Sequence, residues 1–264
     1  KINLGGGDDT FIAFFDTVND VQETVDGGAG IDTYDASSIA INMSINLGNK
    51  SHTAPSGFDF WLNTVAATTS NFNFSPASNA TETVLGFENI IGGGAGDLLA
   101  GSDVANRLEG RGSLDDLWGY GGNDYLDGGA DADEIVGGLG ADILIGGTGD
   151  DDFYYFDIKD SGVTKNTRDT IQDFVVGAGG DRINLSAIDA DTTNAANTND
   201  AFTFIGTNEL WTGVAGELRA VWTATGQVIE GDVNGDKKAD FSIFIYDGGS
   251  HQVLSNVNQV DFIL

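Results

Sequence analysis

Cysteine is absent from this 264-residue chain, and proline occurs only twice. Without cysteine, no disulfide bond can hold the fold together. Basic residues are also scarce, because 11 lysines and arginines stand against 41 aspartates and glutamates, giving a formal charge of −30. A surface this negative repels nucleic acid and anionic membranes, so we expect neither as a partner.

Long apolar stretches are missing as well. The sequence holds no run of about 18 apolar residues, so we expect no membrane span. The first residues, KINLGGGDDTF, do not have the features of a secretory signal. They already resemble the repeats described below, and we therefore interpret the chain as part of a longer protein that has an upstream domain.

Glycine, in contrast, is abundant, with 39 residues, and it marks a repeat. Residues 92–154 contain seven consecutive nine-residue units that all begin with glycine, and the clearest is GGLGADILI, Gly137 to Ile145. The sixth position is aspartate in every unit except one, which has Asn106, and the eighth is always apolar. The pattern G-G-x-G-x-D-x-U-x, where U is apolar, is typical of a calcium-binding parallel β-roll.

Each unit predicts a tight glycine-rich loop of about six residues followed by a very short strand. The apolar eighth residue points inward, because neighbouring strand residues face opposite sides. One unit makes half a turn, so units 18 residues apart lie above one another. We therefore predict an all-β fold, a right-handed parallel β-roll. Residues 1–91 form irregular turns and covering strands, residues 92–156 the regular repeats, and residues 157–264 a C-terminal antiparallel β cap over the end of the array.

This stacking places the sixth-position side chains in two rows, where successive loops can enclose a cation. Calcium prefers six to eight oxygen ligands and accepts backbone carbonyls beside carboxylates. We predict sites between residues 18 apart: Asp97 and Asp115, Asn106 and Asp124, Asp115 and Asp133, Asp124 and Asp142, Asp133 and Asp151, and as an extension Asp142 and Asp160. The loop positions predicted to complete them are Gly119, Gly121, Gly128, Ala130, Gly137, Leu139, Gly140, Gly146, Thr148 and Gly149.

The seven units are not equally regular. The unit at Gly101 has Asn106 as its ligand residue, and the unit at Gly110 has Arg111 and Ser113 in place of glycines. We expect weak or absent calcium binding on these two loops. The alternative for the whole array, that the Gly-Asp pairs are only turns, does not account for seven units in unbroken phase.

Outlying copies of the repeat occur near the N-terminus. LGGGDDTFI offers Asp9 and GGAGIDTYD offers Asp32 as ligands, and a copy between them places Glu23 at the ligand position. The first copy is out of phase with the second, so we expect a loop between them. Strict alternation over residues 39–47 predicts a strand with one buried face, and residues 48–82 predict extra strands and long loops over the first turns.

Two further features of the sequence suggest binding sites, and each has a structural alternative. DVNGDKKAD spaces Asp232, Asn234, Asp236 and Asp240 in a way reminiscent of an EF-hand loop, but no glutamate stands at the twelfth position. A turn with solvated acids is the alternative. Trp118, Tyr120 and Tyr125 offer an outward aromatic face for a glycan, and the favoured alternative is that they pack across neighbouring strands.

The stretch from Gly86 to Ile188, which includes GFENIIGG, GSDVANRLEG, the tandem units, DTIQDF and DRINLSAI, resembles the C-terminal repeats-in-toxin domain of serralysin-type metalloproteases. AFTFIG, AGELR and GDVNGDKKADFSI continue the resemblance. The final Asp261-Phe262-Ile263-Leu264 is similar to the acidic-plus-three-apolar terminus of proteins exported by type I secretion. The resemblance covers about residues 84–264.

The resemblance implies a roll filled with Ca²⁺, export through the type I secretion apparatus and an extracellular location in a bacterium. It does not imply a protease, because the chain has no H-E-x-x-H motif and only two histidines, His52 and His251. We therefore expect a non-enzymatic calcium-binding module of a larger extracellular protein, with a carbohydrate-binding or adhesion module as the alternative. A hidden enzyme is a weaker hypothesis, since no nucleophile and base are legible as a pair.

Overall fold

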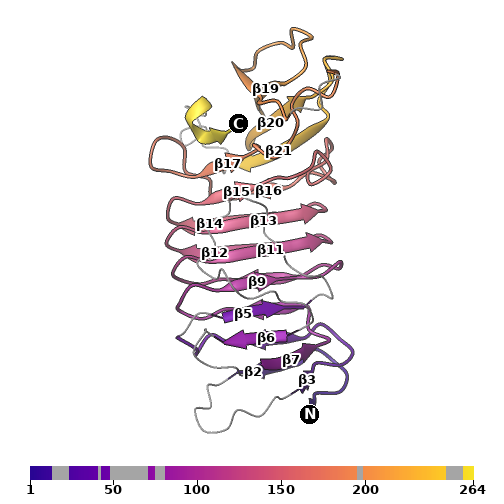
Figure 1. Ribbon diagram of the computed structural model, residues 1–264, viewed down its shortest axis with the longest axis vertical. Coiled ribbons are helices and arrows are strands. Elements are labelled where there is room, and N and C mark those ends of the chain that lie inside the picture. The colour runs from indigo at the N-terminus through magenta and orange to yellow at the C-terminus, as the bar shows by residue number, and fades with distance from the viewer. Residues whose placement is uncertain (14–23, 41–42, 48–70, 75–80, 195–198, 248–257) are drawn as a thin grey trace.

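The computed structural model describes residues 1–13, 24–40, 43–47, 71–74, 81–194, 199–247 and 258–264. The described residues form short strands and one 3₁₀ turn, Gln259–Asp261, with no α-helix among them. The strands stack as successive layers of an elongated spiral, which has the N-terminus at one end and the C-terminal strands at the other (Figure 1). The all-β parallel β-roll expected from the repeats is confirmed.

Two sheets of eleven strands each form the opposite walls of the roll. The first contains, in spatial order, β1 (Ile2–Asn3), β3 (Thr24–Asp26), β7 (Thr81–Leu85), β6 (Asn71–Phe74), β5 (Met43–Asn46), β9 (Leu98–Ala100), β11 (Asp116–Gly121), β13 (Glu134–Leu139), β15 (Asp152–Tyr154), β17 (Arg182–Asn184) and β22 (Phe262–Ile263). The second contains β18 (Thr203–Thr207), β19 (Glu217–Trp222), β20 (Gly226–Asp232), β21 (Phe241–Tyr246), β16 (Thr170–Ile171), β14 (Ile143–Thr148), β12 (Tyr125–Ala130), β10 (Arg107–Glu109), β8 (Asn89–Ile91), β4 (Thr33–Asp35) and β2 (Thr10–Ile12).

The 18-residue spacing of the repeats sets the register within each sheet. Leu117 of β11 lies beside Ile135 of β13, and Leu126 of β12 lies beside Leu144 of β14, in parallel pairs. The apolar eighth position faces inward in every repeat unit and is almost completely buried: Leu99, Leu108, Leu117, Leu126, Ile135, Leu144 and Phe153. Burial of each such side chain contributes about 1.5–3 kcal/mol, so this central column is a major source of stability.

The C-terminal region continues the two walls of the roll. Strands β19, β20 and β21 are antiparallel, as the predicted cap requires, and β21 then pairs in parallel with β16 of the roll. Strands β15, β17 and β22 extend the opposite wall in parallel. The layers thus run on beyond residue 156, where the strict nine-residue period of the sequence ends.

The N-terminal region differs from the expectation in two respects. Ser44 and Asn46 are as buried as Met43 and Ile45, so both faces of β5 are covered rather than one. Strands β6 and β7 lie within the first wall rather than over the first turns, and β6 pairs antiparallel with β5 on one side and with β7 on the other. Antiparallel hairpins add strands edge to edge, and β7 then rejoins the parallel order beside β3.

Candidate metal centres

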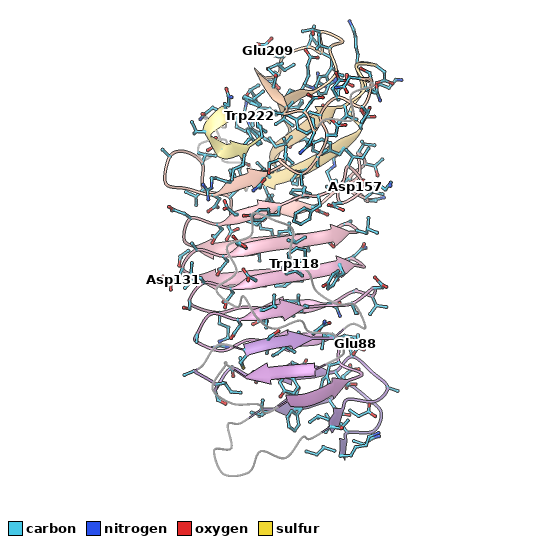
Figure 2. The ribbon with its side chains drawn as sticks, viewed as in Figure 1. Glu88, Trp118, Asp131, Asp157, Glu209 and Trp222 are labelled. Atoms are coloured by element: carbon cyan, nitrogen blue, oxygen red, sulfur yellow. The ribbon has the colours of Figure 1, made fainter. Side chains whose placement is uncertain are left out.

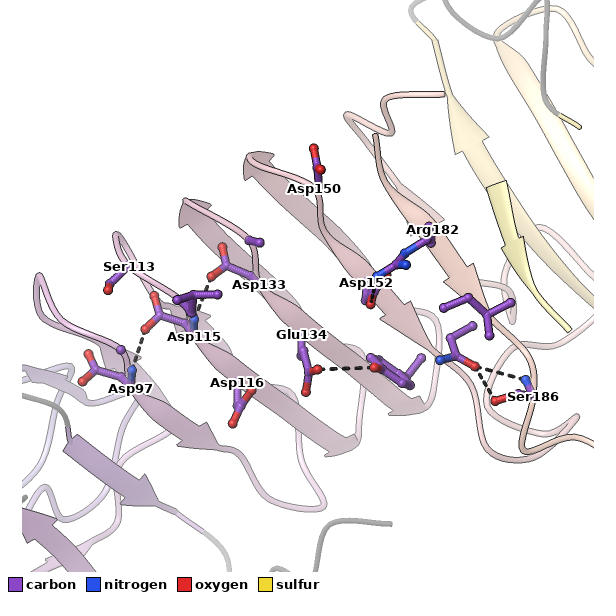
Figure 3. A pocket seen from close by; sticks show the side chains of 16 residues that line it. Asp97, Ser113, Asp115, Asp116, Asp133, Glu134, Asp150, Asp152, Arg182 and Ser186 are labelled. Carbon is purple, nitrogen blue, oxygen red and sulfur yellow. Dashed lines mark hydrogen bonds and ion pairs between the residues drawn. The ribbon is translucent and has the colours of Figure 1, made fainter. Parts of the chain in front are cut away.

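The sixth-position carboxylates hold successive layers together through one of their two oxygens. The backbone N–H of Asp97 donates to Oδ1 of Asp115 at 2.6 Å, and that of Asp115 donates to Oδ1 of Asp133 at 2.8 Å (Figure 3). In the second row, the N–H of Asp124 donates to Oδ1 of Asp142 at 2.8 Å. The predicted 18-residue partners therefore meet, and each carboxylate accepts a charge-assisted hydrogen bond from the preceding layer.

The other oxygen of these carboxylates has a different environment. Within the described part of the chain, Oδ2 is buried and accepts no hydrogen bond in Asp115, Asp124, Asp133 and Asp142. In Asp9, Asp32 and Asp169, Oδ2 is likewise buried and accepts no hydrogen bond from the described residues. A buried carboxylate oxygen without a hydrogen-bond donor is costly unless a cation or a proton compensates it. The repeated orphan oxygen therefore fits a row of cations along each edge of the roll.

The first glycine of each unit makes room for this oxygen. A Cβ atom at Gly119 would lie 2.5 Å from the carbonyl oxygen of Gly137 and closer still to Oδ2 of Asp124. The same collision with the unit's own aspartate would occur at Gly110, Gly128, Gly137 and Gly146. Glycine is thus required because the unit's own carboxylate, joined at Gly110 and Gly119 by a carbonyl oxygen of the next layer, occupies the place of a Cβ.

Burial also raises the pKa of these carboxyl groups. It raises the pKa of Asp115 to about 9 and that of Asp133 to about 8, and neighbouring aspartates add to both shifts. The pKa of Asp124 and that of Asp142 rise to about 7, again because burial disfavours the charged form. A divalent cation would reverse this preference, since it favours the ionised carboxylate.

The donor set restricts the kind of metal. All the candidate ligands are hard oxygens, which suit calcium rather than a transition metal. In the described ranges, no three acidic or histidine side chains converge on one point. Each site would therefore need backbone carbonyls to complete its ligand set, and the loop positions predicted from the sequence would supply them.

Glu88 continues one of the rows at a position that was not predicted from the sequence. Oε2 of Glu88 accepts the N–H of Asp32 at 2.9 Å, and the carbonyl of Glu88 accepts from Nδ2 of Asn106 at 2.7 Å (Figure 2). Glu88 therefore takes the place of an aspartate between these two layers. The repeat pattern does indicate this residue, because residue 88 is the sixth position of the nine-residue unit that directly precedes Gly92 in phase.

The predicted pairing of Asp142 with Asp160 is wrong. The N–H of Asp142 donates instead to Oδ1 of Asp169 at 2.9 Å, a spacing of 27 residues. Oδ2 of Asp160 accepts the N–H groups of Phe156 and Asp157 and so closes a local turn. The reason is that residues 157–168 form an insertion of turns, which moves the next strand of this wall nine residues further along the chain.

The remaining N-terminal candidates follow the same geometry as the central ones. The N–H of Asp9 donates to Oδ1 of Asp32 at 2.8 Å, so these two aspartates are partners in the first layers despite a spacing of 23 residues. Glu23 lies outside the described residues, as do His52 and His251. Asn106 uses both amide atoms in protein contacts, since its Oδ1 also accepts the N–H of Ser102 at 2.7 Å.

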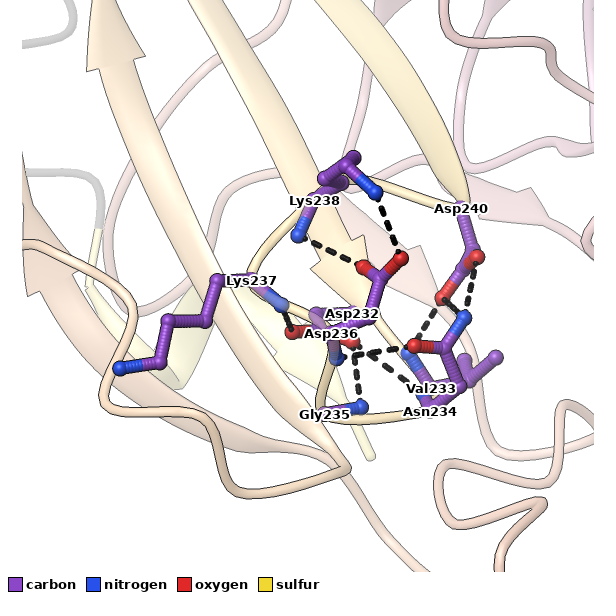
Figure 4. Close-up of polar contacts among 8 residues, drawn as sticks. All are labelled: Asp232, Val233, Asn234, Gly235, Asp236, Lys237, Lys238 and Asp240. Carbon is purple, nitrogen blue, oxygen red and sulfur yellow. Dashed lines mark hydrogen bonds and ion pairs between the residues drawn. The ribbon is translucent and has the colours of Figure 1, made fainter.

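The loop DVNGDKKAD connects β20 to β21 and is held by hydrogen bonds within the loop (Figure 4). Oδ1 of Asp232 accepts the N–H of Gly235 at 2.7 Å, and Oδ2 of Asp240 accepts the N–H of Val233 at 2.8 Å. Asp236 forms an ion pair with Lys238 at 3.0 Å, and Asn234 donates its amide to Asp240. Asp232 is completely buried rather than solvated, and metal binding by this loop stays a prediction.

A groove of about 770 Å³ runs along the outer side of the first wall, beside one row of carboxylates (Figure 3). Its lining includes Asp116, Glu134 and Asp152, which stand side by side on β11, β13 and β15. Asp152 forms a two-pronged ion pair with Arg182. Burial raises the pKa of Asp116 to about 7, while a hydrogen bond with Glu134 acts in the opposite direction.

The aromatic residues of the repeat do not form the outward face considered from the sequence. Trp118 is buried and stacks on Phe156, with ring centroids 5.6 Å apart, and it also contacts Tyr120. Tyr125 belongs to the opposite wall, where the guanidinium of Arg107 lies over its ring. Trp118 and Tyr120 therefore pack across neighbouring strands, and Tyr125 is not part of the same surface.

The family described as the serralysin C-terminal domain of the M10 peptidases matches residues 68–258. No curated protein matches the chain. Among solved structures, the chain is similar to the AlgE6R3 subunit of a mannuronan C5-epimerase from Azotobacter vinelandii, with 24% identity and a TM-score of 0.30 over 64% of this chain and 78% of that one. No helix in the described residues is long and apolar enough to cross a membrane.

Proposed function

Because the chain belongs to the serralysin C-terminal family of the M10 peptidases, a non-catalytic module of secreted proteins that carries calcium-binding repeats, we propose that it folds when calcium binds outside the cell. The observation that carries this proposal is the row of buried Oδ2 atoms that accept no hydrogen bond from the described residues. In this proposal the module stabilises a larger extracellular protein, and the upstream polypeptide supplies whatever activity that protein has.

The residues that would hold calcium are those of the two rows. Asp97, Asp115, Asp133 and Asp151 line one edge of the roll, and Asp9, Asp32, Glu88, Asp124, Asp142 and Asp169 line the other. Carbonyl oxygens of the glycine-rich loops would complete each ligand set. Bound calcium would supply positive charge between carboxylates that otherwise repel one another.

The same charges explain why the chain would stay unfolded without the metal. Two rows of buried carboxylates can be ionised only at a large desolvation cost, and the short strands offer little apolar area to offset the ordering of 39 glycines. In a cytosol with little free calcium, an unfolded chain can pass through a type I secretion channel. Millimolar calcium outside the cell suits the weak sites of extracellular modules.

The C-terminus supports this order of events. In the folded protein, Asp261 is fully buried, and its carboxylate accepts the N–H of Gly177 at 2.6 Å and that of Asn258 at 2.8 Å. Phe262 packs against Phe204, and β22 pairs with β17. A secretion signal at these last residues would be accessible only before the cap folds, so export would precede calcium-dependent folding.

The experiment compares two substitutions in one loop. Asp133→Asn removes a buried row carboxylate, whereas Asp131→Asn removes an exposed carboxylate two residues away. We expect circular dichroism to show little β signal in chelator and a calcium-induced rise for the native chain. Asp133→Asn should raise the calcium concentration at the midpoint, and Asp131→Asn should leave it nearly unchanged. A chain that is fully folded in excess chelator at neutral pH would contradict the proposal.

A further inference from the structure

We propose that the N-terminal end of the roll is a docking surface for one further β-roll layer, which continues both walls in parallel. The surface consists of residues 2–12, that is β1, β2 and the glycine-rich loop between them. This inference goes beyond the proposed calcium function, because it concerns what covers the first layer rather than what the layers bind.

The glycines of the first loop carry the argument. In inner layers, glycines with left-handed backbone angles face the preceding layer at very close range. Gly28, with φ +106°, has no room for a Cβ because the carbonyl oxygen of Gly5 occupies that place, and Gly147 faces Gly129 in the same way. The left-handed conformation and the close approach thus occur together where a preceding layer is present.

Gly5 and Gly7 have the same conformation without that neighbour. Their φ angles are +106° and +116°, yet no atom of the described residues lies within 4 Å of the positions where their Cβ atoms would be. The first loop is therefore shaped like an inner loop on its open side. The space beside these glycines matches the place where a preceding layer would put its carbonyl oxygens.

The backbone amides and the core agree with this interpretation. The N–H groups of Ala29 and Thr33 donate to the carbonyls of Gly5 and Asp9, at 3.1 and 2.9 Å. The equivalent N–H groups of Gly6 and Thr10 meet no preceding carbonyl in the described part of the chain. Ile2 of β1 is 39% exposed at this end, whereas its partner Val25 in the next layer is completely buried. Open strand edges and exposed apolar side chains are features that repeat arrays normally cover.

The geometry selects the occupant. The N–H groups of Gly6 and Thr10 need carbonyl acceptors. The C-terminal side of a preceding β-roll layer would present such carbonyls in parallel register with β1 and β2. The C-terminal end of a second copy presents β18 and β22 as its edge strands, rather than a glycine-rich repeat layer of the kind that faces Gly28 and Gly147 (Figure 1). Two N-terminal ends placed face to face would pair β1 and β2 antiparallel with their copies, which differs from the parallel register of the first two layers. A layer supplied by further polypeptide of the same repeat type fits the surface.

The test adds such a layer. A copy of residues 134–151 fused directly ahead of Lys1 places the copied Asp151 two positions before Ile2, where β1 begins, and the copied Asp142 18 residues before Asp9. We expect amide hydrogen exchange at Gly6 and Thr10 in calcium to slow by about tenfold or more, with a higher Tm. A fusion that leaves these amides as fast as in the native chain would overturn the inference.

Two substitutions make the test specific. Gly5→Ala should remove the gain in protection and Tm in the fused chain but have a smaller effect in the native chain, because only the added layer brings a carbonyl against the new Cβ. Gly6→Ala is the matched control, since its Cβ would make only an ordinary contact with the Ala29 carbonyl at 3.6 Å. Equal effects of Gly5→Ala in both chains would contradict the proposal.

Failure of this inference can be told apart from failure of the proposed function. Amides of β10 and β12 report calcium-dependent folding, whereas those of Gly6 and Thr10 report docking at the end. Loss of protection in the inner strands would count against the proposed function, while protected inner strands with open Gly6 and Thr10 amides in the fusion would count against docking alone. Protection of Thr10 that rises with the concentration of the native chain would favour a second copy and overturn the inference.

Discussion

Row aspartates with an orphan Oδ2, such as Asp133, have two tasks, one for each oxygen. Oδ1 of Asp133 accepts the N–H of Asp115, which joins two layers, while Oδ2 points into buried space beside Gly128. Asn106 keeps a layer contact in a different way, since its Nδ2 donates to the carbonyl of Glu88 in the preceding layer and its Oδ1 accepts the N–H of Ser102 in its own loop. It cannot contribute the negative charge that the second task needs, so layer contact and cation binding are separable at a single side chain.

The irregular unit at Gly110 carries backbone strain at the residue scale. Ser113 has φ +78° and Arg111 has φ +86°, a region that residues with a Cβ avoid. We predict that Ser113→Gly raises the free energy of unfolding in calcium by about 0.5–1 kcal/mol, because glycine removes the strain but adds freedom to the unfolded chain. Denaturant titration measures this change.

Ser37→Gly serves as the control for that substitution. Ser37 lies in a turn and is not among the residues with positive φ, so glycine offers no relief there. We expect it to lower stability by up to about 1 kcal/mol. If both variants shifted stability in the same direction, strain at Ser113 would not be the cause of its effect.

At the scale of the element, no strand of the roll is stable alone. Strands such as β10 and β15 have three residues each, and each is bordered by strands one layer above and one below. Parallel pairs of this length depend on the loops that set their spacing. The glycines at which two loops touch are therefore as important to the strands as the buried leucines.

A substitution at such a contact tests this dependence. In Gly138→Ala, the new Cβ would collide with the carbonyl of Tyr120 in the preceding layer, at a residue with φ +90°. We predict a loss of at least about 1–2 kcal/mol in the free energy of unfolding. Gly112→Ala is the control, since no described atom lies within 4 Å of its Cβ position, and it should be neutral or slightly stabilising. Comparable losses in both variants would refute close layer contact as the cause.

At the scale of the whole molecule, the buried carboxylates act together. Burial raises their pKa values from the ordinary 3.8 to between about 6, as in Asp97, and about 9, as in Asp115. The folded, metal-free chain therefore binds more protons than the unfolded chain above pH 4. Its stability is greatest at acid pH and is lost as the pH rises through these folded-state values.

The pH dependence of calcium binding should run in the opposite direction. We predict that the metal-free chain gains β signal in chelator as the pH falls from about 8 to about 5, because protons replace the missing cations. The calcium concentration at the folding midpoint should rise over the same range, since binding must displace those protons. Circular dichroism at a series of pH values measures both trends, and a metal-free β signal that grows with rising pH would contradict them.

The sequence by itself determined the period, the inward column and the family of the molecule. An apolar eighth residue and a sixth-position aspartate recur every nine residues, and a local pattern of this kind specifies its own repeating geometry. It also contained the information for Glu88, which continues the phase by one unit. The all-β parallel roll and the 18-residue register followed from these local features.

Only the tertiary structure decided how the rows continue where the period breaks. Asp142 pairs with Asp169 rather than with Asp160. Strands β6 and β7 lie within the first wall, and Trp118 and Tyr125 lie on opposite walls. The physical reason is that an insertion interrupts the nine-residue period, so the sequence no longer indicates which residues form the next strand of the wall. Which strand next joins a sheet depends on long-range edge pairing and burial, and these belong to the folded chain rather than to any short stretch of residues.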